Sequence, residues 1–272
     1  MTSPLFERRQ LGRTGLTAGR LGVSSGYGAP TEAFEEAFER GVNYFYWGSR
    51  RTEAMRRAIR SIVAQGKRDK LILVLQSYTR WAPWMERSLT KGLRELGADS
   101  ADILLLGWYG HPPSRKILER AEKMRERGLF RFLAISGHRR PFFAEIGGDT
   151  QYGVFHLRYN AAHRGAEAEV FPKLPDQDRP GIVTFTTTRW GDLLKSGKMP
   201  AGEAPLTGSD CYRFALSNPA VDVCMSGPSD LGQMREALRA LDLGPLSDDE
   251  MARARRIGDF VREHSKKLFA GN

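Results

Sequence analysis

The stretch SLTKGLRELGADSADILLLGW, residues 88–108, decides the fold. Its first half belongs to the amphipathic segment MERSLTKGLRELG (85–97), in which apolar residues recur at helical spacing. Its second half, ADILLLGW (101–108), is a continuous apolar run of strand length. A helix that leads directly into a buried strand is typical of a βαβ unit, in which neighbouring strands run parallel.

The same alternation extends in both directions along the chain. The other strand-like runs are AGRLGVSS (18–25), VNYFYW (42–47), KLILVL (70–75), LFRFLAI (129–135), YGVFHL (152–157), GIVTFT (181–186) and VDVCM (221–225). Amphipathic stretches separate most of them, at 32–41, 53–66, 114–128 and 229–241 among others, whereas 161–179 is irregular. Eight strand–helix units predict an α/β fold, a (β/α)8 TIM barrel, although the periodicity alone also admits an open doubly wound sheet.

One more helix is expected after the last strand, from about Ser247 to Lys267. Ser247 and Glu250 have the spacing of a capping box, in which a hydroxyl and a carboxylate each bind a free backbone N–H. No linker, repeat or low-complexity segment divides the chain. We therefore expect one barrel domain over residues 1–272.

Composition narrows the functional classes. The 272 residues are 40% hydrophobic, which suffices for one large core, and no apolar run has membrane-span length. Only two cysteines occur, Cys211 and Cys224, without metal-ligand or disulfide spacing, so we expect a cytoplasmic protein without a membrane segment or metal. The net charge of +10 suits an anionic ligand, but most charges interleave on helix-like segments, and no nucleic-acid-binding motif accompanies them.

Several segments resemble the aldo-keto reductase superfamily, in the same order along the chain. LGRTGLTAGRLGVSSG (11–26) is similar to that family's LGRTGLKVSRLGLGT opening, and ERGVNYFYWG (39–48) to ERGINFFDTA. RDKLILVLQ (68–76) resembles RDKLVLATK, residues 88–108 resemble SLxxSLxRLGxDYIDLLLLHW, and ERGLFRFLAISGH (126–138) resembles the GKIRYIGVSN segment. The resemblance implies a (β/α)8 barrel and NAD(P)H-linked reduction of a small carbonyl compound.

The four residues that perform this reduction in the family are replaced. In the family a tyrosine protonates the carbonyl oxygen, a lysine lowers the pKa of that tyrosine, an aspartate holds the lysine and a histidine orients the substrate. The resemblance places the aspartate at Tyr46, the lysine at Gln76 and the histidine at Gly107, and the tyrosine at Ser49 or Arg51. Reduction by the family's proton relay is therefore not expected.

Other side chains are expected at the carboxyl ends of the strands, where barrel enzymes have their sites. They make an aromatic mouth with several Arg and His residues, suited to a small flat or anionic molecule, or else to packing alone. His111 and His138 are the candidates for new acid–base chemistry, and Tyr46 with His111 is a hypothetical acid–base pair. The expected mouth residues are Tyr46, Trp47, Arg50, Arg51, Gln76, Tyr78, Trp81, Trp84, Trp108, Tyr109, His111, His138, His156, Arg158 and Trp190.

The cofactor-binding positions implied by the resemblance are changed too, though less completely than the tetrad, because His156 stands at the position of a family glutamine. They are Ser136 and His156 near the nicotinamide, Gly191 in the loop after the seventh strand, and Gly227, Ser229 and Gln233 near the adenosine phosphate. These residues predict NADP(H) as the cofactor, although Ser229 also suits the N-cap of the helix that follows it. The cysteines of the family's iron–sulfur branch are absent from the sequence.

Three functions fit the sequence. The first is a diverged NADP(H)-linked oxidoreductase that acts on a small carbonyl compound. The second is a cofactor-independent isomerase or lyase, and the third is a non-catalytic pseudoenzyme that binds a ligand or protein partner. The chain is short for this family, so we also expect abbreviated loops and an open pocket at the barrel mouth. The sequence does not determine the substrate or the oligomeric state.

Overall fold

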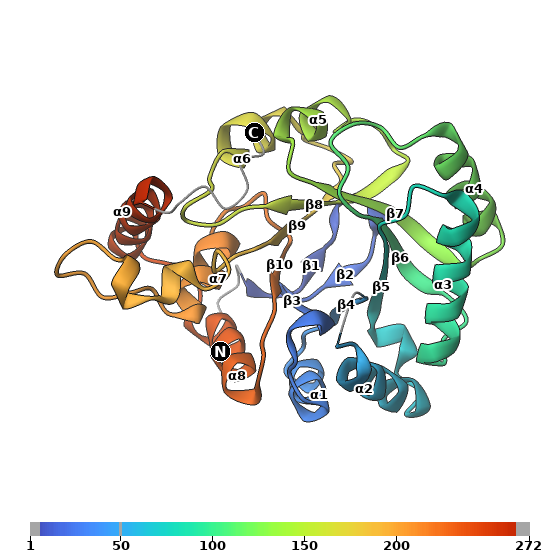
Figure 1. Ribbon diagram of the computed structural model, residues 1–272, viewed down its shortest axis with the longest axis horizontal. Helices are drawn as coiled ribbons and strands as arrows, with labels where there is room; N and C mark the ends of the chain where they lie inside the picture. The colour runs from blue at the N-terminus through green and yellow to red at the C-terminus, as the bar shows by residue number, and fades with distance from the viewer. Residues whose placement is uncertain (1–5, 49–50, 265–272) are drawn as a thin grey trace.

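The computed structural model describes residues 6–48 and 51–264. Eight strands close a barrel in the order β10-β3-β4-β5-β6-β7-β8-β9, and each neighbouring pair is parallel (Figure 1). They are β3 (Leu21–Ser24), β4 (Tyr44–Trp47), β5 (Ile72–Ser77), β6 (Ala101–Leu106), β7 (Phe130–Gly137), β8 (Tyr152–Arg158), β9 (Gly181–Phe185) and β10 (Val223–Ser226). The predicted TIM barrel is confirmed, and the open sheet is excluded because β10 pairs with β3.

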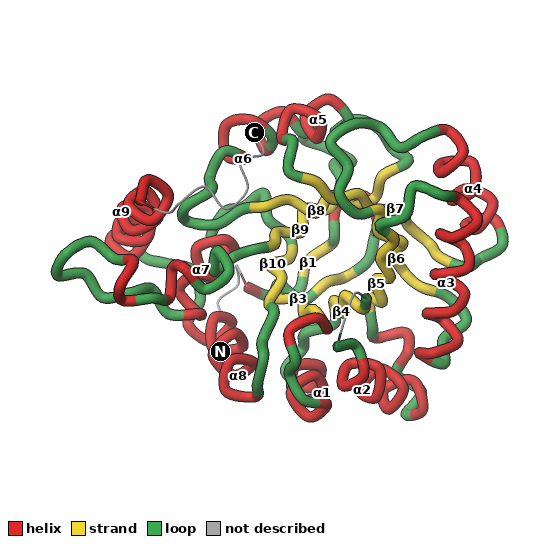
Figure 2. The backbone as a smooth tube through the Cα atoms, viewed as in Figure 1, coloured by secondary structure: helices red, strands yellow, loops and turns green. Residues whose placement is uncertain are grey.

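Helices surround the strands, as Figure 2 shows. Each strand of the barrel is followed by a helix before the next strand begins, so the eight strand–helix units of the sequence are all present. The helices are α1 (Thr31–Glu39), α2 (Glu53–Ala64), α3 (Ala82–Leu96), α4 (Arg115–Glu126), α5 (Arg140–Glu145), α6 (Ala166–Glu169), α7 (Gly208–Leu216) and α8 (Leu231–Leu243). The segment at 161–179, irregular in sequence, contains only the one-turn helix α6 and a 3-10 turn.

The extra C-terminal helix is also confirmed. It is α9 (Asp248–His264), and the last residues of the predicted segment, 265–267, lie outside the described residues. Its capping box forms as expected, because the Ser247 N–H donates to the Glu250 carboxylate at 2.8 Å and the Glu250 N–H donates to the Ser247 hydroxyl at 3.2 Å. No helix in the described part is long and apolar enough to cross a membrane.

The core has two layers. Side chains that alternate along the strands point into the barrel, where Tyr44, Val74 and Leu105 pack with the apolar residues of the other strands. The intervening side chains, such as Phe45 and Leu75, pack outward against the helices in a larger cluster. Tyr44 and Tyr46 therefore face inward, and Phe45 faces outward.

A small hairpin closes the amino end of the barrel. Its strands β1 (Arg9–Gln10) and β2 (Thr17–Ala18) pair antiparallel, and the hairpin contributes Ala18 and the connecting residues Leu11 and Leu16 to the barrel interior. The first barrel strand is consequently shorter than the predicted 18–25. The chain leaves the hairpin at Arg20, whose buried guanidinium donates to the Val221 and Asp222 carbonyl oxygens at 2.8 and 2.9 Å.

The loops at the carboxyl end differ in length. The loop after β6, residues 107–114, is short as expected, whereas the connection after β9 runs from 186 to 207 and includes two 3-10 turns. The expectation of abbreviated mouth loops is therefore wrong for β9. Part of this long connection, Asp192–Leu194, packs against α9, which supports it from outside the barrel.

Candidate active site at the barrel mouth

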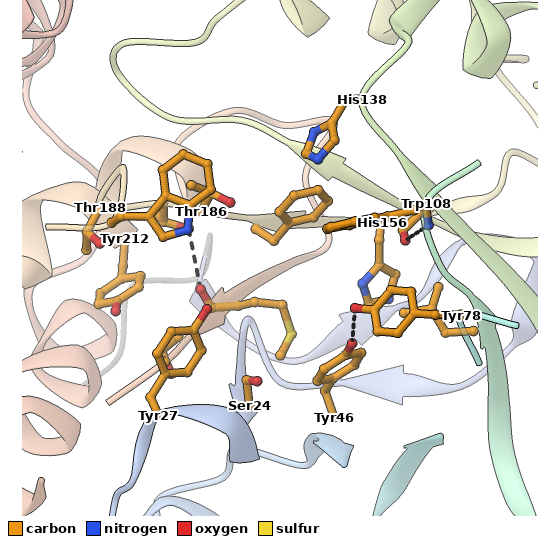
Figure 3. A pocket seen from close by; sticks show the side chains of 18 residues that line it. Ser24, Tyr27, Tyr46, Tyr78, Trp108, His138, His156, Thr186, Thr188 and Tyr212 are labelled. Carbon is orange, nitrogen blue, oxygen red and sulfur yellow. Dashed lines mark hydrogen bonds between the residues drawn. The ribbon is translucent and has the colours of Figure 1, made fainter. Parts of the chain in front are cut away.

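A cavity of about 320 Å³ opens at the carboxyl end of the barrel. Aromatic rings and hydroxyl groups dominate its wall, and none of the 18 described residues that line it is Asp, Glu, Lys or Arg. Figure 3 shows Tyr46 and Tyr78 pointing toward one another on one side, and Tyr27 and Tyr212 on the other. The lining residues are Ser24, Tyr27, Tyr46, Tyr78, Leu105, Trp108, Ser136, His138, His156, Phe185, Thr186, Thr187, Thr188, Trp190, Tyr212, Met225, Ser226 and Gly227.

His156 forms part of the floor of this cavity. It is buried on β8, and its Nε2 atom hydrogen-bonds the Tyr44 hydroxyl below it at 2.7 Å. Its ring also lies against Tyr46, with 6.2 Å between the ring centroids. Burial lowers the pKa of His156 to about 3, so the imidazole is neutral at physiological pH.

Tyr78 covers the end of β6. A Cβ atom on Gly107 would lie 2.1 Å from a ring carbon of Tyr78, so the tyrosine ring occupies the space that a side chain at 107 would need. The Tyr78 hydroxyl hydrogen-bonds the Tyr46 hydroxyl at 3.1 Å, and its ring meets Trp108 edge-on. Because position 107 has no side chain, the Tyr78 ring can lie there with its hydroxyl next to that of Tyr46.

The cavity is uncharged near neutral pH. Burial raises the pKa of Tyr46, and the neighbouring Tyr78 raises it further. Burial likewise raises the pKa of Tyr27 and of Tyr212. The pKa of His138 is lowered by burial and by the charge of Arg158, so this imidazole is neutral too. The phenols can donate hydrogen bonds to a ligand, but no Lys or Arg among the described lining residues makes them strong acids.

Backbone strain is concentrated in the loop after β9. Thr186, Arg189 and Trp190 have φ values of 60°, 53° and 53°, in the left-handed region that side chains rarely adopt. The Asn160 side-chain amide donates to the Thr186 carbonyl oxygen at 2.8 Å and fixes the start of the loop. Since Thr186 and Trp190 both line the cavity, the strained backbone positions part of its wall.

The amino end of α8 follows the cavity residue Gly227 by a few residues in the chain. The Asp230 carboxylate is the N-cap and accepts from the Gln233 N–H at 2.8 Å. The Ser229 N–H donates to the Gln233 side-chain oxygen at 3.0 Å, and the Ser229 hydroxyl donates to Asp230 at 3.2 Å. The proposed N-cap role of Ser229 is therefore wrong, because the helix begins two residues later and Asp230 caps it.

Solved structures of other proteins share this architecture. No protein-family model matches the chain, and no curated protein matches it in sequence. The holo form of aldo-keto reductase AKR11C1 from Bacillus halodurans superposes with a TM-score of 0.74 at 19% identity, over 93% of this chain and 96% of that one. An aldo/keto reductase from Klebsiella pneumoniae in complex with NADP and acetate gives a TM-score of 0.72 at 17% identity, with the same coverage. This chain has the aldo-keto reductase fold.

The positions that the resemblance assigns to the family's tetrad lie as follows. Tyr46 faces the cavity, and Gly107 lies beneath the ring of Tyr78. Gln76 instead lines a neighbouring hollow, where a Cβ atom on Gly48 would meet its side chain at 2.6 Å. Ser49 lies outside the described residues, as does the predicted mouth residue Arg50.

The remaining candidates at the rim lie apart from Tyr46. Arg51 is at the edge, with its guanidinium 3.5 Å from the Tyr27 carbonyl oxygen. His111 is exposed, does not line the cavity, and hydrogen-bonds the neighbouring Pro112 carbonyl at 3.0 Å. The hypothetical Tyr46–His111 pair is therefore not formed, because His111 lies on the outer part of its loop and the Tyr46 hydroxyl contacts Tyr78.

Three of the predicted cofactor positions, Ser136, His156 and Gly227, line the cavity, and Gly191 does not. Ser136 and His156 pair across β7 and β8 and line the cavity, and the Ser136 hydroxyl accepts from the Trp108 N–H at 3.3 Å. Gly191 has a φ of 81° and ends the strained loop, outside the lining. Gly227 lines the cavity, but the Tyr27 ring packs on it so closely that a Cβ atom there would lie 2.4 Å away.

The amino end of α8 fits a phosphate poorly. Free N–H groups make a helix terminus attractive to phosphate, but those of Ser229 and Gln233 already donate to side chains here. The Asp230 carboxylate adds a negative charge at the same point. The residues present thus suit the nicotinamide end of NADP(H) better than its phosphate end. Among the described residues there is also no group of three or more His, Cys, Asp or Glu side chains that could hold a metal ion.

The sequence predicts Tyr78 as a mouth residue, but it does not predict that the Tyr78 ring lies over Gly107. Nothing in the spacing of residues 76–78 shows that the ring folds back over Gly107. A glycine at the position of a family histidine was the available signal, because the vacated volume has to be filled by a neighbour. Tyr212 was missed entirely, since it comes from α7 and reaches the cavity only through the barrel's closure.

Proposed function

We propose that this chain is a diverged member of the aldo-keto reductase family whose barrel mouth binds a small, uncharged carbonyl compound. The carbonyl oxygen would accept hydrogen bonds from the hydroxyls of Tyr46 and Tyr78. The observation that carries this proposal is the phenol pair, with its oxygens 3.1 Å apart at the wall of an uncharged cavity of about 320 Å³. A cavity of this size suits a small organic ligand.

The phenols would polarise the carbonyl without protonating it efficiently. Burial keeps the pKa of Tyr46 high, so its hydroxyl remains a neutral donor toward an oxygen that gains negative charge. A well-placed general acid typically contributes about 10²- to 10⁴-fold to a rate, and no described cation lines the cavity to lower a phenol's pKa. Reduction at this site would therefore be slow compared with that of a lysine-activated tyrosine.

NADP(H) is the cofactor that the fold implies, and it would supply hydride to a bound carbonyl. Two observations support binding of the nicotinamide end, namely the cavity-lining positions of Ser136 and His156. The capped and acidic terminus of α8 argues against tight binding of the adenosine phosphate. We therefore expect the dinucleotide to bind weakly, and the carbonyl compound to bind without it.

Titration followed by tryptophan fluorescence tests the proposal, because Trp108 and Trp190 line the cavity. Benzaldehyde should quench the fluorescence saturably in the absence of nucleotide. Tyr78→Phe should weaken this binding about fivefold, since the loss of one hydrogen bond costs about 1 kcal/mol. Tyr152 is the first residue of β8, at the end of the strand away from the cavity. Tyr152→Phe is therefore the matched control and should bind like the wild type. Equal affinity for all three proteins would refute the phenol-pair site.

A second candidate function needs no cofactor. His138 lines the same cavity, its imidazole is neutral, and its Nδ1 atom is buried without a hydrogen-bond partner among the described residues. A neutral imidazole can remove a proton from the carbon next to a carbonyl while phenols stabilise the enolate oxygen. Proton–deuterium exchange of cyclohexanone in D₂O, followed by NMR, tests this function. It predicts exchange that His138→Gln abolishes and that NADPH does not increase.

A further inference from the structure

Beside the cavity, four arginines from separate elements gather around the end of β8. Arg158 is the last residue of β8, and its register partner on β9 is Phe185, which lines the cavity. Arg140 begins α5, Arg189 lies in the strained loop after β9, and Arg262 lies near the end of α9. The helix α5 packs on α6, and α9 packs on the loop after β9 and pairs with α6 through Arg255 and Glu167, so the arginines come from adjoining elements.

The positive charge of this cluster is poorly compensated. Arg140 pairs with Glu169 at 2.9 Å, and Arg189 has only a long contact of 3.7 Å to Asp192. Asp192 is already held by Lys198 at 2.6 Å. Neither Arg158 nor Arg262 has a carboxylate within ion-pairing distance in the described part of the chain.

Neighbouring arginines outside the cluster have close carboxylate partners. Arg164 pairs with Asp259 at 2.7 Å, and Arg255 pairs with Glu167 at 2.8 Å. Both lie within the same layer of α6 and α9, so acidic partners are available to this part of the fold. The missing partners of the cluster are therefore a local feature and do not follow from the chain's overall positive charge.

Several donors in the cluster are buried and unused. The Nη1 atom of Arg189 and the Nε atom of Arg140 are buried without a hydrogen-bond partner among the described residues, and the Arg189 side chain is only 11% exposed. Buried charged donors without partners are rare because the loss of water is not repaid. His163, in the same region, has its pKa lowered to about 3 by burial and by the nearby arginines, so it does not add to the charge.

We propose that Arg140, Arg158, Arg189 and Arg262 form a binding site for a small oxyanion, a phosphate or carboxylate group, next to the mouth cavity. Guanidinium groups bind both oxyanions through paired N–H donors, and Arg140 and Arg189 each have a buried donor without a partner among the described residues. The site is separate from the phenol pair, and it does not depend on the proposed carbonyl function.

Calorimetric titration with inorganic phosphate tests the site, with succinate as the carboxylate arm and sodium chloride to hold ionic strength constant. The wild type should bind one of the two oxyanions saturably, and the tighter one identifies the source. Arg158→Gln should weaken that binding at least about tenfold, because a charged hydrogen bond contributes more than a neutral one. Arg115→Gln, whose side chain is 92% exposed on α4, removes the same charge elsewhere and should bind like the wild type.

Thermal melting without phosphate or succinate separates this role from a purely structural one. Because Arg158 faces like charges, Arg158→Gln should melt at the same temperature as the wild type or above it. If Arg158→Gln fails to fold, the exposed Arg262→Gln takes its place and should weaken oxyanion binding several-fold. No saturable binding by the wild type, or equal binding by wild type, Arg158→Gln and Arg115→Gln, would overturn the proposal.

Discussion

The two ends of the barrel are built on opposite principles. At the amino end, the Asp222 carboxylate is fully buried and is bound by Arg179 at 2.7 Å, by Arg9, and by the Ile182 N–H at 2.7 Å. At the carboxyl end, Trp108 is 71% exposed and has a φ of 62°, and the His138 imidazole has an unpartnered nitrogen among the described residues. One end satisfies its polar groups, and the other leaves rings and donors exposed.

This difference separates stability from function. Strained backbone, exposed rings and unpaired donors each reduce stability, so their concentration at one end needs a reason other than folding. The carboxyl end is also where TIM barrels place their sites. The mouth of this barrel is therefore not ordinary packed core, which favours a bound ligand over packing alone.

The largest expected effect lies at the amino end. Asp222→Ala should lower the free energy of unfolding by about 3–5 kcal/mol, because it removes a fully buried carboxylate that pairs with the partly exposed Arg9 and Arg179. Urea denaturation measures this loss. Asp242→Ala, which removes an exposed ion pair with Arg40, is the control and should cost under about 1 kcal/mol. Similar losses for the two variants would break the contrast between a stabilising amino end and the rest of the surface.

His156, at the floor of the cavity, should make the stability of the protein depend on pH. The folded-state pKa of His156 is about 3, below its usual value of 6.5, so the unfolded chain binds the proton more tightly. The stability contributed by neutral His156 is complete above pH 6.5 and is lost progressively as the pH falls toward 3. Between pH 7.5 and 5 this loss should be about 2 kcal/mol.

Urea denaturation at both pH values, on wild type and on His156→Gln, isolates this contribution. The variant should lose about 2 kcal/mol less than the wild type over the same interval. His111→Gln, at an exposed loop histidine, should retain the wild-type slope. A wild-type slope in His156→Gln would mean that the cavity floor admits water and a proton.

The sequence predicted the barrel but only part of its mouth. Strand alternation at residues 44–47 is a local pattern that puts Tyr44 and Tyr46 on the same face of the strand, and both pack toward the barrel interior. The position of Tyr78 over Gly107 and the gathering of Arg158 with Arg262 depend on loop conformation and on contacts across the closed barrel. Such contacts leave no periodic signal, because each residue belongs to a different element.

A smaller effect should follow from restoring a side chain at Gly107. Gly107→Ala places a methyl group 2.1 Å from a carbon of the Tyr78 ring, which must swing away. Tyr78 is 47% exposed, so the cost should be only about 1 kcal/mol, at the low end for overpacking. In a Tyr78→Ala background the same change should cost almost nothing, and a double-mutant cycle measures the coupling. Additive effects would show that the ring does not fill the vacated position.

The smallest effect concerns the strained loop. Thr186 is β-branched and has a φ of 60°, so Thr186→Gly relieves strain in the folded state, while the glycine's freedom stabilises the unfolded chain by a similar amount. The net change in unfolding free energy should stay within about 0.5 kcal/mol. Thr184→Gly, two residues earlier in β9 and without a positive φ, should cost more than this because it only weakens a buried strand. If Thr186→Gly proved as costly as Thr184→Gly, the left-handed backbone at the mouth would carry no strain, and the two ends of the barrel would differ in exposure alone.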